Sequence, residues 1–194
     1  MTRATHPDLT PSAPGSLELV RSFLSLHDHE GDPEVSLPPS SRTVRAFLVD
    51  RGLLGPQERA GEAQLAWARR VHAALHRIVE AGPEAAPPGD VREIERAARE
   101  AGLRPRFDGH PPGLEPTRGG VAGAIGRILA IAFLARIDGS WDHLKVCANE
   151  TCTAVFFDRS KNHSGRWCSM QVCGNRSKVR AWRERQRAGH GATA

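Results

Sequence analysis

Apolar residues recur every three or four positions along most of the first hundred residues, and this spacing predicts amphipathic helices. Four helices are expected, over 17–27, from 41 to a break at Gly52, over 64–80 and over 91–101. Pro56 follows the break and suits the first turn of a helix. Asp90 stands directly before the fourth helix and has the side chain of an N-cap residue.

The stretch Val121–Ile137 is apolar on every side rather than along one face. A membrane-spanning helix needs about 20 apolar residues without a central charge. This stretch is shorter and carries Arg127 near its middle, so we expect the buried central helix of a soluble domain. Residues 103–117, just before it, are rich in proline and glycine and fit either a β-hairpin or an irregular loop.

The chain is therefore expected to be mainly α, with a change of character near Trp141. The predicted parts are a disordered lead (1–15), a helical domain (16–140), a small zinc module (141–189) and a tail (190–194). Mean hydropathy is −0.43, and the polar N-terminus has no apolar signal segment. We expect a cytoplasmic protein without a membrane partner.

All the cysteines of the chain fall within one short segment, as two matched pairs: Cys147-x4-Cys152, then Cys168-x4-Cys173. Four thiolates satisfy the tetrahedral coordination of a structural zinc ion and leave no position open for catalysis. We predict that these four residues bind one structural Zn²⁺. Four buried, reduced cysteines are the alternative, as is a site in which His143 or His163 replaces one thiolate.

The cysteine pairs flank a sequence that resembles a β-hairpin. Residues 153–158 alternate as a strand would, the next residues are turn-forming, and Trp167 returns beside the second pair. The hairpin and the helix expected over 178–187 together suggest a zinc-ribbon or treble-clef-like module. Its aromatic residues, including Phe157, are expected to cover the metal, while Val179 and Trp182 are expected to pack on the hairpin.

The basic excess of the chain lies entirely at its C-terminus. Ten basic and three acidic residues give the last fifty residues a net charge of +7, against −2 for the rest. On a helix, four arginines share one face, and we add two neighbouring basic residues as candidate nucleic-acid contacts: Arg166, Arg176, Lys178, Arg180, Arg183 and Arg187. The expected partner is double-stranded DNA. A solvated helix, with Glu184 pairing along it, is the simpler alternative.

The run FFDRSKNHSGRWCSMQVCGNRSKVRAWRERQR resembles the CGNR zinc-finger proteins of bacteria, whose motif corresponds to Cys173–Arg176. The segments LELVRSFL and AFLVDRGLL resemble the ABATE-type domain found in the same proteins. Ser25-Leu26 stands where relatives often have Asn-Thr, and Ser164-Gly165 where they often have a further arginine. The resemblance implies a stress-induced transcription regulator with an N-terminal ABATE domain.

Other candidate sites have weaker patterns. His72 and His76 have the spacing of metal ligands on a helix but lack the glutamate of an HExxH motif. His27 and His29 lie in an acidic loop, which suggests a solvated turn. With no catalytic motif present, we expect a protein that is not an enzyme, and whose helical domain binds a small molecule or forms a homodimer. An RNA- or protein-interaction module is the alternative function.

Overall fold

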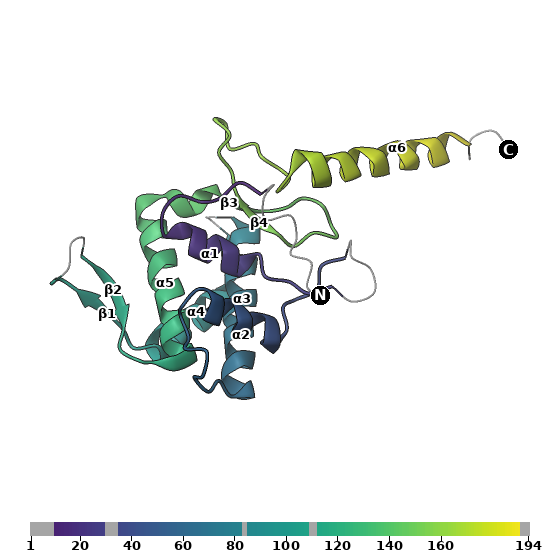
Figure 1. Cartoon of the computed structure of the whole chain (residues 1–194). Helices are drawn as coiled ribbons and strands as arrows, with labels where there is room; N and C mark the ends of the chain where they lie inside the picture. Colours follow the sequence, from purple (N-terminus) through teal and green to yellow (C-terminus); the bar gives the residue numbers. More distant parts are fainter. Residues whose placement is uncertain (1–9, 30–34, 83–84, 109–111, 191–194) are drawn as a thin grey trace.

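The computed structural model describes residues 10–29, 35–82, 85–108 and 112–190 (Figure 1). Most of the predicted disordered lead and residues 191–194 of the tail lie outside these ranges. The chain is mainly α, and the helical part is followed by a β-hairpin, a cysteine cluster and a last helix, as predicted. The first four helices are α1 (Leu17–Leu24), α2 (Ser41–Asp50), α3 (Glu62–Ala81) and α4 (Pro88–Glu100).

Helix α4 begins earlier than expected. Pro87 is its N-cap residue and Pro88 occupies the first turn, where the missing proline N–H costs nothing. Asp90 therefore lies inside the helix and does not cap it. Its carboxylate instead accepts hydrogen bonds from Arg77 of α3 at 2.6 and 3.0 Å, which ties the two helices together.

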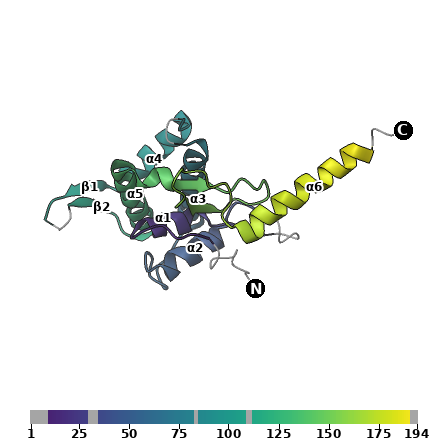
Figure 2. The ribbon, with the colours of Figure 1, turned by 90° about the horizontal axis from the view of Figure 1, so that it is seen from above.

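The proline- and glycine-rich segment before the central helix is a hairpin, so the structure decides between the two alternatives. Strands β1 (Leu103–Arg106) and β2 (Gly113–Pro116) pair antiparallel. Gly102, directly before β1, has a φ of +63°, and a Cβ there would lie 2.1 Å from the hydroxyl of Thr117. The hairpin points away from the helical body (Figures 1 and 2).

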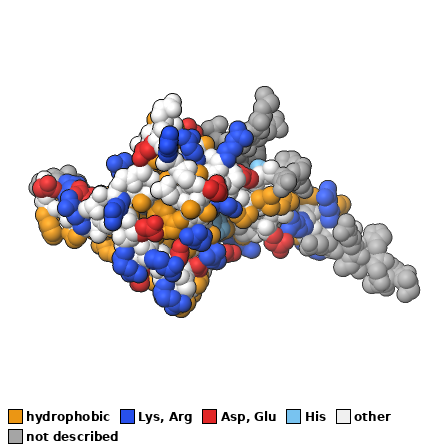
Figure 3. Space-filling model, turned by 90° about the horizontal axis from the view of Figure 1, so that it is seen from below, with side chains coloured by type: hydrophobic (Ala, Val, Ile, Leu, Met, Phe, Trp, Pro, Cys, Tyr) orange, Lys and Arg blue, Asp and Glu red, His pale blue; other side chains and the backbone are white. Residues whose placement is uncertain are grey.

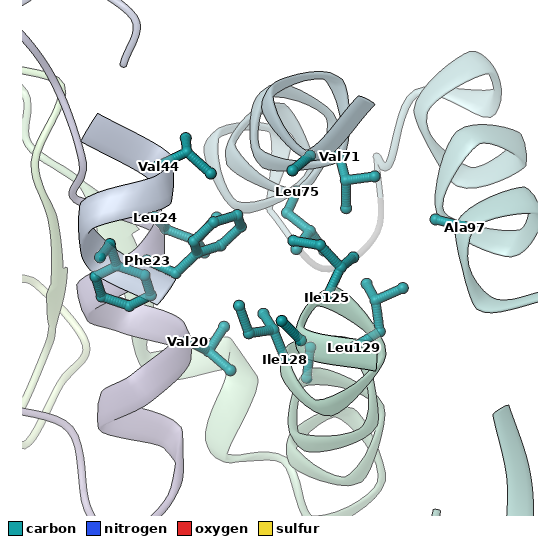
Figure 4. Close-up of a cluster of buried hydrophobic side chains, with 14 of the residues drawn as sticks. Val20, Phe23, Leu24, Val44, Val71, Leu75, Ala97, Ile125, Ile128 and Leu129 are labelled. Atoms are coloured by element: carbon teal, nitrogen blue, oxygen red, sulfur yellow. The ribbon is translucent and has the colours of Figure 1, made fainter. Parts of the chain in front are cut away.

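Helix α5 (Gly120–Asp138) is the centre of the helical body. Its apolar side chains meet those of α1, α3 and α4, as Figure 4 shows for Val20, Leu75, Ile125 and Ile128. The helix is long and apolar enough to cross a membrane, but 56% of its most apolar window is buried inside the protein. This burial confirms the prediction of a core helix, because most of its hydrophobic side chains pack inside the protein.

After α5 the chain makes a 3₁₀ turn (Ser140–His143) and an antiparallel hairpin of β3 (Leu144–Val146) and β4 (Val155–Phe157). The predicted hairpin lay between the cysteine pairs, but the strand pairs instead with residues before Cys147. A π turn (Met170–Gly174) then leads into α6 (Asn175–His190), which starts three residues earlier than predicted. Helix α6 projects from the body on the side opposite the β1–β2 hairpin (Figures 1 and 2). Basic and acidic side chains are interspersed over the helical body itself (Figure 3).

Candidate metal centre and basic helix

The four cysteines converge from three short pieces of chain. Cys147 follows β3, and its N–H bonds to the carbonyl of Ala154 at 3.0 Å, next to β4. Cys152 closes a tight turn through its N–H and the carbonyl of Asn149 at 2.8 Å. Cys168 precedes the π turn and Cys173 lies within it. The hairpin and the π turn thus bring the two cysteine pairs together.

The sulfur atoms have the geometry of a tetrahedral site. All four lie within 4.8 Å of one another, with Cys152 and Cys168 3.9 Å apart and Cys168 and Cys173 3.6 Å apart. A tetrahedron with Zn–S bonds of about 2.3 Å has edges of about 3.8 Å. In the part of the chain that the structure describes, no other group of histidine, cysteine or acidic residues meets the same test.

The two histidines considered as alternative ligands lie elsewhere. The Nδ1 atom of His143 lies 2.9 Å from the carbonyl oxygen of Asp158, and its ring stacks on Phe157. The ring of His163 packs against that of His143. Both histidines are thus engaged by other residues, and neither belongs to the cysteine cluster.

The protonation of the cluster shows why it suits a cation. Thiol hydrogen bonds from Cys152 and Cys168, with backbone N–H groups of Cys168 and Asn149, lower the pKa of Cys147. The pKa values of Cys152 and Cys168 are raised, because these thiols donate hydrogen bonds to Cys147. Their deprotonation would also place negative charges next to that of Cys147. A positive ion among these sulfur atoms would offset the repulsion between neighbouring thiolates.

A second layer of contacts orients the cysteines. The buried side chain of Asn149 directs its Nδ2 atom at the sulfur of Cys173, 3.8 Å away. Ser169 accepts a hydrogen bond from the N–H of Val172, and its carbonyl accepts one from Gly174. A Cβ at Gly174 would lie 3.0 Å from the sulfur of Met170, which leaves little space for a larger residue. Asn149 was not predicted, since an asparagine between cysteines has no signal of its own.

The aromatic cover of the cluster differs from the prediction. Phe156 is buried among the cysteines together with the partly buried Trp167. Phe157, expected to cover the metal, points to the other side of β4 and belongs to the core of the helical body. Successive residues of a strand face opposite sides, so one hairpin contributes to two clusters.

Asp158 organises the loop that follows β4. Its nearly inaccessible carboxylate accepts hydrogen bonds from Lys145 (2.7 Å) and from the N–H groups of Ser160 and Gly165 (both 2.9 Å). Burial acts to raise the pKa of Asp158, but these donors hold it well below its usual range. A Cβ at Gly165 would come within 2.6 Å of the carboxylate, so this loop packs closely around it.

The hairpin is fastened to the first helix by polar contacts. The hydroxyl of Ser25 donates to the carbonyl of Val155 at 2.8 Å and accepts from its N–H at 3.1 Å. Arg21 donates to the same carbonyl, and His76 of α3 lies 2.8 Å from the carbonyl of Thr153. Ser25 is one of the two residues that depart from the Asn-Thr pair of relatives, and here it joins α1 to β4.

Helix α6 presents its described basic side chains to solvent. Arg176, Lys178, Arg180, Arg183 and Arg185 of the helix are exposed, as is Arg166, which precedes it. Arg180 forms an ion pair with Glu150 beside the cysteine cluster, at 2.9 Å, and Arg166 lies over the ring of Trp167. The side chain of Arg187, also predicted as a contact, lies outside the described residues, as does that of Glu184.

The prediction for the apolar side chains of α6 is wrong. Val179 and Trp182 were expected to pack on the hairpin, but they are 48% and 55% exposed. The helix extends away from the body (Figure 1), and neither residue belongs to the core of the helical body or to the cysteine cluster.

Comparison with protein-family models gave two matches. The model called ABATE, described as "Putative stress-induced transcription regulator", matches residues 14–137. The chain belongs to the ABATE family. A second model, the CGNR zinc finger, matches residues 143–186. A search of curated proteins found no match.

In this ABATE-family protein the zinc-finger match includes every cysteine of the cluster and most of α6. The match and the sulfur geometry together confirm the prediction of one structural zinc ion. The arrangement expected from the resemblance, an ABATE domain followed by a CGNR finger, is confirmed as well.

Proposed function

We propose that the protein is a cytoplasmic transcription regulator that binds double-stranded DNA through α6. In this proposal Cys147, Cys152, Cys168 and Cys173 hold the zinc ion as thiolates. Residues 141–189 act as the DNA-binding module, and residues 16–140 sense a ligand or form a homodimer. Both families found are regulatory or zinc-finger families, which supports this class of function over catalysis.

The observation that carries the proposal is the position of the basic helix relative to the metal cluster. Helix α6 begins two residues after Cys173. Ser169 accepts a hydrogen bond from the N–H of Val172, and the Nδ2 atom of Asn175 donates to the carbonyl of Gln171, so the π turn is joined directly to the helix. A metal ion that fixes Cys173 would therefore fix the direction in which α6 leaves the body. A rigid, exposed helix with cations along it can lie against successive phosphates of a duplex.

The ion pair of Arg180 is compatible with this use. Its partner Glu150 is highly exposed, and an exposed pair contributes at most about 1 kcal/mol. A phosphate can replace the carboxylate at small cost. The negative charge of Glu150 would then lie near the phosphates and repel them. Glu150→Gln removes this charge and should therefore strengthen binding slightly.

The test is a titration of zinc-loaded protein with a random-sequence duplex at two or more salt concentrations. Each phosphate contact contributes about −0.9 to the slope of log affinity against log salt. The double variant Arg180→Ala/Arg183→Ala should bind more weakly, with a slope shallower by up to about 2. The control is Arg92→Ala/Arg99→Ala, which removes the same charge from exposed positions of α4. Equal effects of the two double variants, or no binding by the parent, would reject the proposal.

A single-stranded nucleic acid, RNA in particular, is the second candidate, and one observation favours it. Trp182 is exposed next to Arg183, and an exposed aromatic ring can stack on an unpaired base. Competition of the duplex with single-stranded RNA separates the two functions. If RNA displaces the duplex and Trp182→Ala weakens RNA binding by about 1–3 kcal/mol, the single-stranded partner is correct.

A further inference from the structure

The helical body contains an apolar pocket that is lined by none of the cysteines. The pocket has a volume of about 430 Å³ and opens between α3, α4 and α5. Its inner wall consists of apolar side chains that are buried or nearly so: Leu75, Ile78, Ile94, Leu129, Ala132 and Trp141. Pockets for small ligands are typically about 300–1,000 Å³ and mostly apolar.

The mouth of the pocket has two distinctive features. Phe133 and Ile137, successive turns of α5, stand at its edge with 54% and 69% of their surface exposed. Glu95 of α4 and Arg136 of α5 also line it, and both are exposed. The two charges have opposite sign, so the mouth favours neither a cation nor an anion.

Helix α5 explains why apolar residues surround the pocket. Its apolar residues continue around the whole helix, a pattern typical of a helix that is covered on all sides. Its N-terminal half is covered, but at its C-terminal end Phe133, Leu134 and Ile137 face solvent. Something is therefore expected to lie against this end of α5.

A second copy of the chain is a poor candidate for this cover. A stable dimer buries roughly 800 Å² on each partner. Three part-exposed side chains, interrupted by Glu95 and Arg136, provide much less apolar surface than that. A concave site with a deep apolar wall instead fits a compact molecule that enters it.

We propose that this pocket binds a small hydrophobic molecule without net charge, its apolar body against Leu129 and Trp141 and its outer end against Phe133 and Ile137. The site is separate from Ser25 and Leu26, where relatives often have Asn-Thr, because neither residue lines it. The proposal does not rest on nucleic-acid binding, since occupancy can be measured without any nucleic acid.

The test uses the uncharged fluorophore N-phenyl-1-naphthylamine and the full-length, zinc-loaded protein. The probe should bind saturably, one per chain, with the blue-shifted emission of an apolar site. Trp141 lies in the pocket wall, so excitation of tryptophan should transfer energy to the bound probe. Trp67 of α3 also lies within transfer distance, so Trp141→Phe should reduce this transfer rather than abolish it, and should reduce it more than Trp182→Phe, on α6, does.

Two variants locate the site by affinity. Ile137→Glu adds a charge at the mouth on an already exposed position and should weaken probe binding about five- to tenfold. Ala132→Leu fills the pocket and should weaken it further. The matched control is Phe107→Glu, which makes the same kind of change on the distant β1–β2 hairpin, where Phe107 is exposed. Its affinity should equal that of the parent.

Three results would overturn the proposal. The first is the absence of saturable binding, and the second is binding that Ile137→Glu leaves unchanged or that Phe107→Glu abolishes. The third comes from sedimentation: if the parent is a dimer that Ile137→Glu dissociates, the end of α5 is covered by a second copy. Because these experiments contain no DNA, their failure is independent of the test of DNA binding.

Discussion

Phe156 and Phe157 are neighbours in β4, yet each stabilises a different part of the molecule. Phe156 packs among the cysteines, and Phe157 packs with the helices. Replacing a buried phenylalanine by alanine costs about 3–5 kcal/mol. Phe157→Ala should therefore lower the midpoint of thermal unfolding strongly while the zinc content stays near one per chain.

Phe156→Ala should lower the midpoint as well, but it should also lose zinc faster to a chromogenic chelator, because Phe156 packs among the cysteines. The two variants serve as controls for each other, since both remove one buried ring from the same strand. If both lose zinc equally fast, the separation of the two clusters is wrong.

The sulfur atom of Cys168 contacts two others in the cluster, those of Cys152 at 3.9 Å and Cys173 at 3.6 Å. Cys168→Ser replaces a thiolate with a hydroxyl that is a poor zinc ligand at neutral pH. The purified variant should contain well under one zinc per chain by elemental analysis. A full equivalent of tightly bound zinc would contradict the assignment of this residue as a ligand.

At the scale of the elements, His72 makes the contact between α1 and α3 sensitive to pH. Its ring packs edge-on against Phe23, and its Nε2 atom is buried without a hydrogen-bond partner. Burial, with the nearby His76, lowers the pKa of His72 from 6.5 to about 3. In the unfolded chain His72 is therefore protonated below about pH 6.5, whereas in the folded protein it stays neutral down to about pH 3. His72 therefore favours the folded state less as the pH falls through this window.

The expected loss is up to about 1.4 kcal/mol per pH unit below 6.5. His72→Gln removes the titrating group, so urea unfolding at pH 7, 6 and 5 should show a shallower pH dependence than the parent. Loss of zinc in acid also destabilises the protein, but it affects both proteins equally. The exposed His163→Gln is the control and should keep the slope of the parent. Parallel slopes for His72→Gln and the parent would exclude the role of His72.

The elements also show what could be predicted from the sequence. Helical periodicity predicted α1 to α4, because each buries one stripe against a common core, and an unbroken apolar stretch predicted α5. Paired cysteine spacing predicted the metal cluster, because the ligands are local. The alternation of 153–158 predicted a strand but not the partner of each face, since Phe156 and Phe157 are equally apolar. The direction of α6 was also unpredictable: Val179 and Trp182 suggest packing, and only tertiary structure shows that the helix leaves the body.

For the whole molecule, the boundary between the helical part and the zinc module is weaker than the family matches suggest. The matches end at 137 and begin at 143, but the core of the helical body includes Leu144, Val155 and Phe157 from the hairpin. A module that shares a core with its neighbour does not unfold alone. Removing the zinc should therefore destabilise the helices as well.

This coupling leads to a test in which Ser25 is the decisive residue. Far-UV circular dichroism reports mainly on the helical body, and the fluorescence of Trp167 in a protein whose other tryptophans are phenylalanine reports on the zinc module. In the parent background the two signals should change together on heating, and chelation of zinc should shift both midpoints downward.

Ser25→Ala leaves the buried N–H of Val155 without its hydroxyl partner, at a cost of about 1–3 kcal/mol. In this variant the fluorescence transition should move below the circular dichroism transition, because the link between α1 and β4 is weakened. If the two transitions are already separate before Ser25 is changed, the hairpin does not join the two parts into one cooperative unit.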